Sequence, residues 1–264
     1  MQRTANVHLE LETFGRTNMV FSMTPAIGAN IASELLEFRL DGAIQHAAET
    51  VDVHGTRLHT FLTEKGLLAV DYSLEIGGEA AVDPIDERDL ITYLRPSRYA
   101  QSDTLTPFAR SEFAGLTGYT LIQAITNWVF ESLTYASGSS RPTDSATETL
   151  ASRRGVCRDF AHATIALLRA MEIPARMVAV YAPGLSPMDF HAVTEAFVDG
   201  AWWVIDSSRL APRQSLVRIS TGRDAADTAW LTSTLTDLSF RSMTLTVTTP
   251  SLPLDNHTDR VQLR

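Results

Sequence analysis

The sequence contains few of the features that mark secreted, membrane or nucleic-acid-binding proteins. Its 264 residues include one cysteine, so no disulfide can form within the chain, which fits a reducing compartment. No run approaches the roughly 18 apolar residues of a membrane span, and residues 1–10 lack the apolar segment of a signal peptide. The formal net charge of −9 disfavours nucleic acid or an anionic membrane as the partner. We therefore expect a cytoplasmic globular protein.

Several ligand-binding and catalytic motifs are also absent from the sequence. It has no phosphate-binding G-x-x-x-x-G-K, no dinucleotide-binding G-x-G-x-x-G and no G-x-S-x-G nucleophile elbow. Neither C-x-x-C nor H-E-x-x-H is present, and zinc sites usually need such local ligand pairs. A metal site formed by Cys157, His162 and His191 is a minor alternative, and we expect no metal and no cofactor.

Several short segments between Val7 and about Ile76 alternate between apolar and polar types, most clearly residues 68–76. A period of two is typical of strands with one buried face. Short strands separated by glycine-containing turns predict an antiparallel sheet, a sandwich or a small barrel. The histidines of this part, His46, His54 and His59, are predicted to lie on the surface.

The remaining chain predicts an α+β fold. Prolines space residues 83–107, which we interpret as a linker after an N-terminal β-domain at residues 1–82. Helical periodicity follows, with helices expected near residues 121–133, 145–150 and 157–171. Strands are expected at 175–181, 190–198 and 201–205, a short helix near 224–231, and one late strand at 242–248. The catalytic core is assigned to residues 108–249, and residues 250–264 to a loose polar tail.

Cys157 stands where a polar run ends and a strongly apolar helical pattern begins. Free amide N–H groups and the positive end of a helix dipole at that position favour thiolate over thiol. A lone cysteine is more often inert packing, so its assignment as a nucleophile needs a base and a group that orients the base.

Two histidines are candidates for that base. His162 lies five residues after Cys157 on the same predicted helix, about 140° around its axis, so we expect packing or a buried hydrogen bond. His191 begins a predicted strand that turns back at Asp199-Gly200, a strong two-residue hairpin signal. The location of His191 on a hairpin makes it the better candidate.

The hairpin predicts a partner for His191. Counting outward from the turn places Ser208 opposite His191 and Asp206 one diagonal step away on the same face, about 7–8 Å at the backbone. A slip of one residue in the turn would change the pairing but still leave the two side chains within reach. A solvated Asp206 and a structurally satisfied His191 are the alternative.

Four segments together carry a family resemblance: Arg154-Gly155-Val156-Cys157-Arg158-Asp159-Phe160-Ala161-His162, Ile173-Pro174-Ala175-Arg176, Asp189-Phe190-His191-Ala192 and Gly200-Ala201-Trp202-Trp203-Val204-Ile205-Asp206. In order and spacing they resemble the bacterial transglutaminase-like superfamily over roughly residues 115–210. Residues 93–99 also resemble the segment that joins such cores to an N-terminal β-domain. The resemblance implies a papain-like fold in which Cys157 is the nucleophile, His191 the general base and acid, and Asp206 the group that orients it.

The sequence departs from the family pattern at two places. Val193 stands where the family often has tryptophan, and Ser207-Ser208 stand where it often has Pro-Thr. Both changes touch the cleft wall and weaken any inference about the substrate. Tyr135 resembles a family aromatic residue near the cleft and is a candidate to help the Cys157 backbone N–H hold an oxyanion, with simple packing as the alternative.

The function implied is thiol-dependent acyl transfer at amide bonds of a peptide or protein substrate. Hydrolysis by a peptidase or amidase is favoured because no feature of the sequence would exclude water. A transglutaminase with an amine acceptor, or a non-catalytic binding module on the same fold, are the alternatives.

Overall fold

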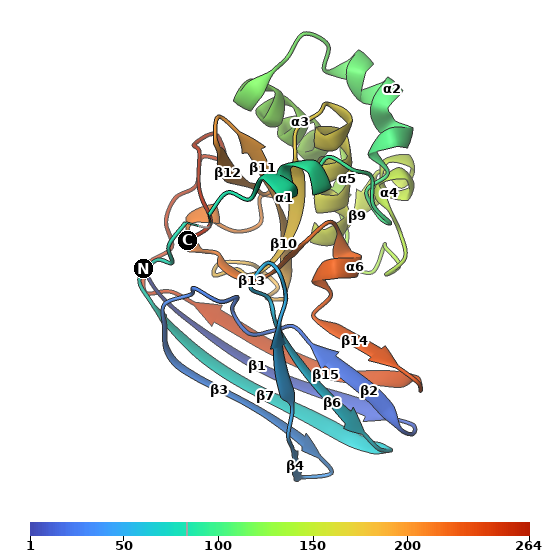
Figure 1. Cartoon of the computed structure of the whole chain (residues 1–264), viewed down its shortest axis with the longest axis vertical. Coiled ribbons are helices and arrows are strands. Elements are labelled where there is room, and N and C mark those ends of the chain that lie inside the picture. The colour runs from blue at the N-terminus through green and yellow to red at the C-terminus, as the bar shows by residue number, and fades with distance from the viewer. Residues whose placement is uncertain (83) are drawn as a thin grey trace.

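A computed structural model describes residues 1–82 and 84–264, and its α+β fold agrees with the prediction. Two parts lie one above the other along the long axis (Figure 1): a β-sandwich below, and a helix-covered sheet above. Within the described residues, no helix combines the length and apolar character needed to cross a membrane.

The sandwich is made of two antiparallel sheets whose strand orders are β15-β1-β7-β3-β4 and β14-β2-β6-β5. Their strands are β1 (Gln2–Thr13), β2 (Thr17–Phe21), β3 (Ile31–Leu40), β4 (Ala43–Gln45), β5 (Ala48–Val51), β6 (Arg57–Thr63), β7 (Gly66–Gly77), β14 (Leu231–Thr234) and β15 (Leu238–Thr248).

Alternation along these strands explains the sandwich. Every second residue of β1 and β7 is buried, including Leu9, Leu11 and Val70, while the residues between them are partly or fully exposed. Aromatic rings connect the two sheets, with Phe38 of one sheet 4.8 Å from Phe61 and 5.0 Å from Phe21 of the other, between ring centroids. Of the architectures predicted for this part, the sandwich is confirmed.

The upper part is an antiparallel sheet of order β12-β11-β10-β13 with helices packed against it. Its strands are β10 (Ala175–Tyr181), β11 (His191–Val198), β12 (Ala201–Ile205) and β13 (Val217–Gly222), and the two-residue strands β8 (Thr134–Tyr135) and β9 (Arg154–Gly155) pair separately. The helices are α1 (Glu87–Thr92), α2 (Ser102–Glu112), α3 (Gly118–Ser132), α4 (Ala146–Ser152), α5 (Cys157–Ala170), α6 (Ala225–Thr228) and a 3₁₀ turn, η1 (Arg213–Ser215).

Helix α5 is the centre of the upper part. All of its residues from Asp159 to Ala170 are buried, between α2, α3 and α4 on one side and β10 and β11 on the other. The predicted helix that begins at Cys157 is confirmed, and so are the predicted helices that correspond to α3 and α4. Burial on every side fixes the position of the cysteine at its first residue.

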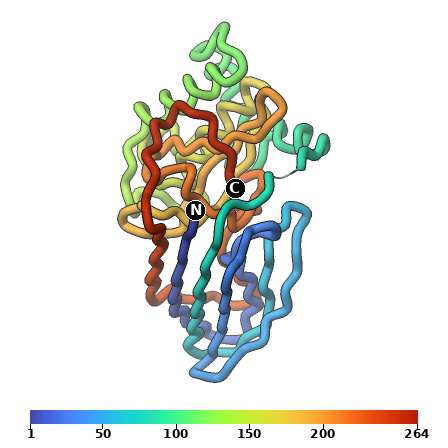
Figure 2. The backbone as a smooth tube through the Cα atoms, turned by 90° about the vertical axis from the view of Figure 1, so that its left-hand side faces the viewer, coloured from blue at the N-terminus to red at the C-terminus, as the bar shows by residue number. Residues whose placement is uncertain are grey.

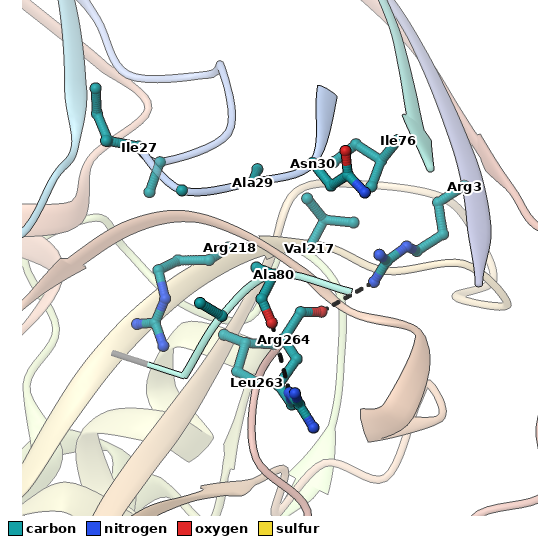
Figure 3. Close-up of a pocket in the computed structure, with 13 residues that line it drawn as sticks. Arg3, Ile27, Ala29, Asn30, Ile76, Ala80, Val217, Arg218, Leu263 and Arg264 are labelled. Carbon is teal, nitrogen blue, oxygen red and sulfur yellow. Dashed lines mark hydrogen bonds between the residues drawn. The ribbon is translucent and has the colours of Figure 1, made fainter. Parts of the chain in front are cut away.

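The end of β10 joins the two parts of the molecule. Tyr181 and Val217 of the upper sheet belong to the same apolar core as the sandwich strands. The Tyr181 hydroxyl donates a hydrogen bond to the carbonyl of Met23, 2.6 Å away. At another point of this junction, Figure 3 shows a pocket where the buried Arg3 of β1 donates a hydrogen bond to the carbonyl of Arg264, 3.1 Å away.

The late strand predicted within the catalytic core belongs to the sandwich instead. β15 pairs with β1 over its whole length, for example Leu245 with Val7. The strand itself is predictable because its residues alternate, but alternation does not identify the partner strand. Residues 1–82 therefore form the sandwich only together with β14 and β15, which come from the end of the chain.

Residues 84–107, predicted as part of a linker, contain α1 and most of α2; the proposed boundary at Asp83 lies outside the described residues. Tyr93 is fully buried in this stretch, and its hydroxyl is hydrogen-bonded to His54 Nε2 at 2.7 Å. Its carbonyl accepts a hydrogen bond from the amide of Ala175, 3.1 Å away. This segment therefore packs against both parts of the molecule.

The tail beyond Pro250 lacks helices and strands but is not loose. It curves over the outer side of the upper part and returns to the junction (Figure 2). The amide of Val204 in β12 donates to the carbonyl of Val261 at 2.8 Å, so the tail covers this edge of the sheet. Arg213 and Asp255 form a buried ion pair at 2.8 Å, which fixes the tail at a second point.

The histidines predicted to lie on the sandwich surface differ in burial. His46 is exposed, as predicted, and His54 is partly buried. The prediction is wrong for His59, which is only 8% exposed and lies 3.0 Å from the carboxylate of Glu49. The side chain of His59 faces the aromatic core of the sandwich, 6.5 Å from the Phe38 ring.

Candidate active site

The chain directly before Cys157 is held between strand β8 and Asp159 of α5, which positions Cys157 at the start of the helix. β9 pairs in parallel with β8, which places Tyr135 beside Gly155. A side chain at Gly155 would collide with Asp159, since an added Cβ would lie 2.6 Å from the Asp159 Cβ. Glycine at this position therefore allows the chain to approach the helix closely before it enters α5.

The carboxylate of Asp159, in the first turn of α5, caps the start of this helix. Asp159 is fully buried, and its Oδ2 accepts a hydrogen bond from the amide of Val156 at 2.8 Å. The guanidinium of Arg158 lies 3.2 Å from the other oxygen of this carboxylate. A carboxylate in the first helical turn also interacts favourably with the helix dipole. These contacts fix the orientation of the helix start and hence of the partly exposed Cys157.

The predicted hairpin register is confirmed. Thr194 pairs with Ile205, and Val198 pairs with Ala201 across the turn. Asp199 and Gly200 have φ values of 51° and 77°, as a two-residue turn with left-handed backbone requires. No one-residue slip occurs. His191 begins β11, and Asp206 follows the last residue of β12.

His191 and Asp206 form a buried pair at this end of the hairpin. Nε2 of His191 lies 2.9 Å from Oδ2 of Asp206, and both side chains are almost completely buried. The other carboxylate oxygen accepts hydrogen bonds from the Ser208 amide at 2.9 Å and the Ser208 hydroxyl at 2.6 Å. Burial alone would raise the pKa of Asp206, but His191 and Ser208 lower it below its usual value.

The charge of Asp206 controls the protonation of His191. Burial by itself lowers the pKa of His191, but the charge and hydrogen bond of Asp206, with a further contribution from Cys157, raise it to about 10. Nε2 is already hydrogen-bonded to Asp206. Nδ1 is buried, and since Asp206 occupies Nε2, Nδ1 is the nitrogen that faces the thiol of Cys157, whose side chain also makes a hydrogen bond with His191.

The thiol of Cys157 lies against the residue that precedes His191. Its Sγ is 4.0 Å from the carbonyl oxygen of Phe190. The structure thus brings together the three residues that the sequence selected, from the start of α5, the start of β11 and the position after β12. Sequence reasoning placed Ser208 opposite His191 but missed its contact with the Asp206 carboxylate.

Ser207, the other departure, connects the hairpin to α5. Its hydroxyl is hydrogen-bonded to that of Thr164 at 2.7 Å, in a buried position. Val193 is buried in a small apolar cluster with Val178 and Val204. The departures at Ser207 and Ser208 therefore hold Asp206 in place, and Val193 contributes to packing.

Tyr135 lies beside the candidate nucleophile. Its side chain is partly covered, at 40% exposure, and its hydroxyl is hydrogen-bonded to the backbone of Cys157. Burial, together with the charge of Cys157, raises the pKa of Tyr135 to about 12, so its hydroxyl keeps its proton at neutral pH. Tyr135 stands in β8, which pairs with the strand that directly precedes Val156 and Cys157.

His162 makes a buried hydrogen bond, as predicted. Its Nε2 accepts from the amide of Ala225 at 3.1 Å, and its ring stacks on Tyr99 with centroids 5.3 Å apart. Burial lowers its pKa to about 3, so His162 is neutral. Among the residues that the structure describes, no group of three or more candidate ligands is arranged to hold a metal ion, so Cys157, His162 and His191 do not form one.

Comparison with known proteins places this geometry in a family. The family model of the transglutaminase-like superfamily core matches residues 112–207, which include Cys157, His191 and Asp206. A crystal structure of "a Putative Cysteine Protease from Cytophaga hutchinsonii" is 32% identical, with a TM-score of 0.87. The match covers 97% of this chain and 92% of that chain, so it includes the sandwich as well as the core.

Two further comparisons are less extensive. An uncharacterised protein of Mycobacterium leprae is 29% identical over 168 residues, which are 59% of this chain and 57% of that protein's length. The structure of the periplasmic domain of TgpA from Pseudomonas aeruginosa bound to ethylmercury is 19% identical with a TM-score of 0.43, over 76% of this chain and 91% of that chain. The family model and the full-length structural match agree with the site geometry: this chain belongs to the transglutaminase-like superfamily.

Proposed function

We propose that this protein catalyses thiol-dependent acyl transfer at amide bonds of peptides or proteins, with water as the favoured acceptor. The observation that carries the proposal is the position of His191. Asp206 holds its Nε2 at 2.9 Å, and its buried Nδ1 is the nitrogen left for the thiol of Cys157. A nucleophile, a base and a group that orients the base are the minimum for this chemistry.

The proposed reaction proceeds from the ion pair in which Sγ of Cys157 has given its proton to Nδ1 of His191. The thiolate attacks the carbonyl carbon, and the imidazolium, stabilised by Asp206, then donates its proton to the leaving amine. This step leaves a thioester on Cys157. A water molecule that loses a proton to His191 attacks the thioester, releases the acid and restores the ion pair. The pKa of about 10 for His191 keeps the imidazolium available as the acid near neutral pH.

Tyr135 and the start of α5 are proposed to stabilise the oxyanion. Tyr135 keeps its proton at neutral pH because its pKa is raised to about 12, so it can donate a hydrogen bond. The backbone N–H of Cys157 stands at the first helical residue, where amide groups lack partners within the helix. The Tyr135 hydroxyl is hydrogen-bonded to the Cys157 backbone, so the two groups lie next to each other.

The acceptor separates hydrolysis from transamidation. The full-length match to a protein described as a putative cysteine protease supports water as the acceptor. The test is mass spectrometry of products from a peptide library with and without an added primary amine, with Cys157→Ala as the control. We expect cleaved peptides that are absent with the control variant. A dominant amine adduct would identify a transglutaminase instead.

The competing functional class is a binding module that retains the fold but does not use Cys157, His191 and Asp206 for catalysis. Iodoacetamide labelling near pH 6 separates the two, because an ordinary thiol with a pKa near 8.5 is almost fully protonated there. We expect Cys157 to react faster than glutathione under the same conditions, and His191→Gln to remove the difference. A rate equal to that of glutathione would favour the binding module.

A further inference from the structure

We propose that Trp230 and Phe240 form a subsite for an aromatic or large aliphatic side chain of the substrate, several residues from the bond that is cut. The inference rests on the proposed function and adds the class of peptide that this site selects. Both residues come from the sandwich, so the proposal gives that part of the molecule a role in specificity.

A row of aromatic rings leads away from the nucleophile. It begins at Phe190, whose carbonyl oxygen lies 4.0 Å from Sγ of Cys157. The Phe190 ring stacks on Trp230 with centroids 5.3 Å apart and planes 16° from parallel. Trp230 in turn meets Phe240 edge to face at 6.4 Å. Adjacent rings at these distances form one continuous apolar surface.

Exposure increases along this row. Phe190 is 9% exposed, Trp230 is partly exposed, and Phe240 is 50% exposed. The inner end of the row is therefore packed in the core of the protein, whereas the outer end presents apolar surface to solvent. Removal of such a surface from water by a bound apolar side chain is favourable.

A β-bulge directs Phe240 to this position. Glu10 of β1 pairs with Ser242, but the next residue, Leu11, pairs with Phe240, so Arg241 is the extra residue. Paired residues share one face of a sheet, and Leu11 is fully buried on the inner face. Without the bulge, Arg241 would occupy the inner face in place of Phe240. Bulges that redirect a side chain are common beside active sites.

The two residues belong to the edges of two different sheets. Trp230 directly precedes β14, the last strand of one sheet, and Phe240 lies in β15, the last strand of the other. β14 lies just below α6, on the side of the sandwich that faces the helices (Figure 1). The contacts that lead from Sγ of Cys157 through Phe190 and Trp230 to Phe240 match the length of several residues of an extended peptide, which advances about 3.3 Å per residue.

The experiment measures cleavage and binding with one probe, an amine-blocked library of peptides from a digested bacterial proteome. Products formed by the wild-type protein are sequenced by mass spectrometry, and immobilised Cys157→Ala captures peptides that bind without being cut. We expect aromatic and large aliphatic residues to be enriched at one fixed position within about six residues of the cut bond.

Phe240→Ala should lower kcat/KM for an aromatic peptide about tenfold, mainly through KM, and leave its alanine-substituted twin unchanged. Trp230→Phe keeps a ring stacked on Phe190, so it should lower kcat/KM for the aromatic peptide by less than Phe240→Ala does. It also serves as a control for misfolding, because it does not remove the ring as an alanine substitution would. Phe14→Ala is the matched control, because Phe14 is also 50% exposed but is not part of the row.

A lack of positional preference in both assays would overturn the subsite, and so would a preference that Phe240→Ala leaves unchanged. Failure of the proposed function gives a different result. If Cys157→Ala captures aromatic peptides in a Phe240-dependent manner but the wild type cleaves none, the subsite stands and the hydrolysis does not. If the wild type cleaves peptides but shows no preference for aromatic or large aliphatic residues, the hydrolysis stands and the subsite does not.

Discussion

Two buried histidines, one within α5 and one at the start of β11, show how their surroundings, and not burial alone, decide their charge. His162 and His191 are 0% and 1% exposed. The pKa of His162 is lowered to about 3, whereas that of His191 is raised to about 10. Burial lowers both values, but Asp206 lies 2.9 Å from His191, whereas the described partner of His162 is the backbone amide of Ala225.

The comparison teaches that a carboxylate in direct contact outweighs the cost of burying a cation. The charge of Asp224 also raises the pKa of His162, but it does not overcome burial. Where the carboxylate makes a hydrogen bond with the ring, the protonated form is favoured. One histidine therefore serves as neutral packing, and the other is suited to proton transfer.

The largest difference in kcat between the two histidine sites is expected when both histidines are replaced by leucine. His191→Leu should lower kcat on the order of 10⁶-fold, as loss of the base does in enzymes with a comparable triad. His162→Leu should leave kcat per folded molecule unchanged. Peptide cleavage with each variant, normalised to the folded fraction from near-UV circular dichroism, provides the measurement.

His191→Gln is the control for unfolding of the His191→Leu variant, because glutamine can still donate a hydrogen bond to Asp206. Equal losses of activity in the His191→Leu and His162→Leu variants would mean that the two regions do not differ in function.

Asp206→Asn should lower kcat by about 10⁴-fold and also move the pH profile. Wild-type activity should decline as the pH rises through about 10, where His191 loses its proton and can no longer act as the acid. Without the negative charge of Asp206, the pKa of His191 falls, so this decline should begin at lower pH. The pH dependence of kcat/KM measures it, and an unchanged alkaline decline would contradict the role of Asp206.

Tyr135→Phe should lower kcat by about 10²-fold and leave KM nearly unchanged, since an oxyanion donor acts mainly in the transition state. The kinetics of one cleaved peptide measure this effect. A phenylalanine retains the ring contact with Phe160, which is 5.9 Å between centroids, so packing is preserved. A rise in KM alone would indicate that Tyr135 only contacts the substrate.

The smallest effect is a loss of stability in the His162 region. His162→Leu leaves the amide of Ala225 without its acceptor, which should cost about 1–3 kcal/mol of unfolding free energy. Urea denaturation measures the midpoint, and Phe14→Ala, at a half-exposed position, serves as a control that should shift it little. A midpoint equal to that of the wild type would show that the hydrogen bond contributes no net stability.

Local sequence patterns were sufficient to predict much of the candidate active site. A polar run followed by apolar helical periodicity placed Cys157 at the start of α5, and Asp199-Gly200 fixed the hairpin that pairs with the correct register. Both features depend on residues close together in the chain. The role of Ser208 could have been suspected, because a serine two residues after an aspartate commonly bonds its side chain.

Helix α2 shows where local reasoning failed. It contains Pro107 in its interior, where proline normally removes a hydrogen bond and interrupts a helix. The prolines of this segment therefore indicated a linker. In the structure α2 packs on α5, and burial of Ala109 and Phe113 against the core compensates for the local cost.

The sequence by itself determined where the strands and the central helix lie, and that a thiol, an imidazole and a carboxylate occupy their ends. These features follow from periodicity and turn chemistry, which act over a few residues. Only the tertiary structure decided which strands far apart in the chain pair and which histidine is charged. Residues such as Phe240 and Phe190 lie far apart in the chain, and strand alternation does not specify a distant partner. The pairing of β15 with β1 and the burial of Asp206 against His191 are therefore results of the whole fold.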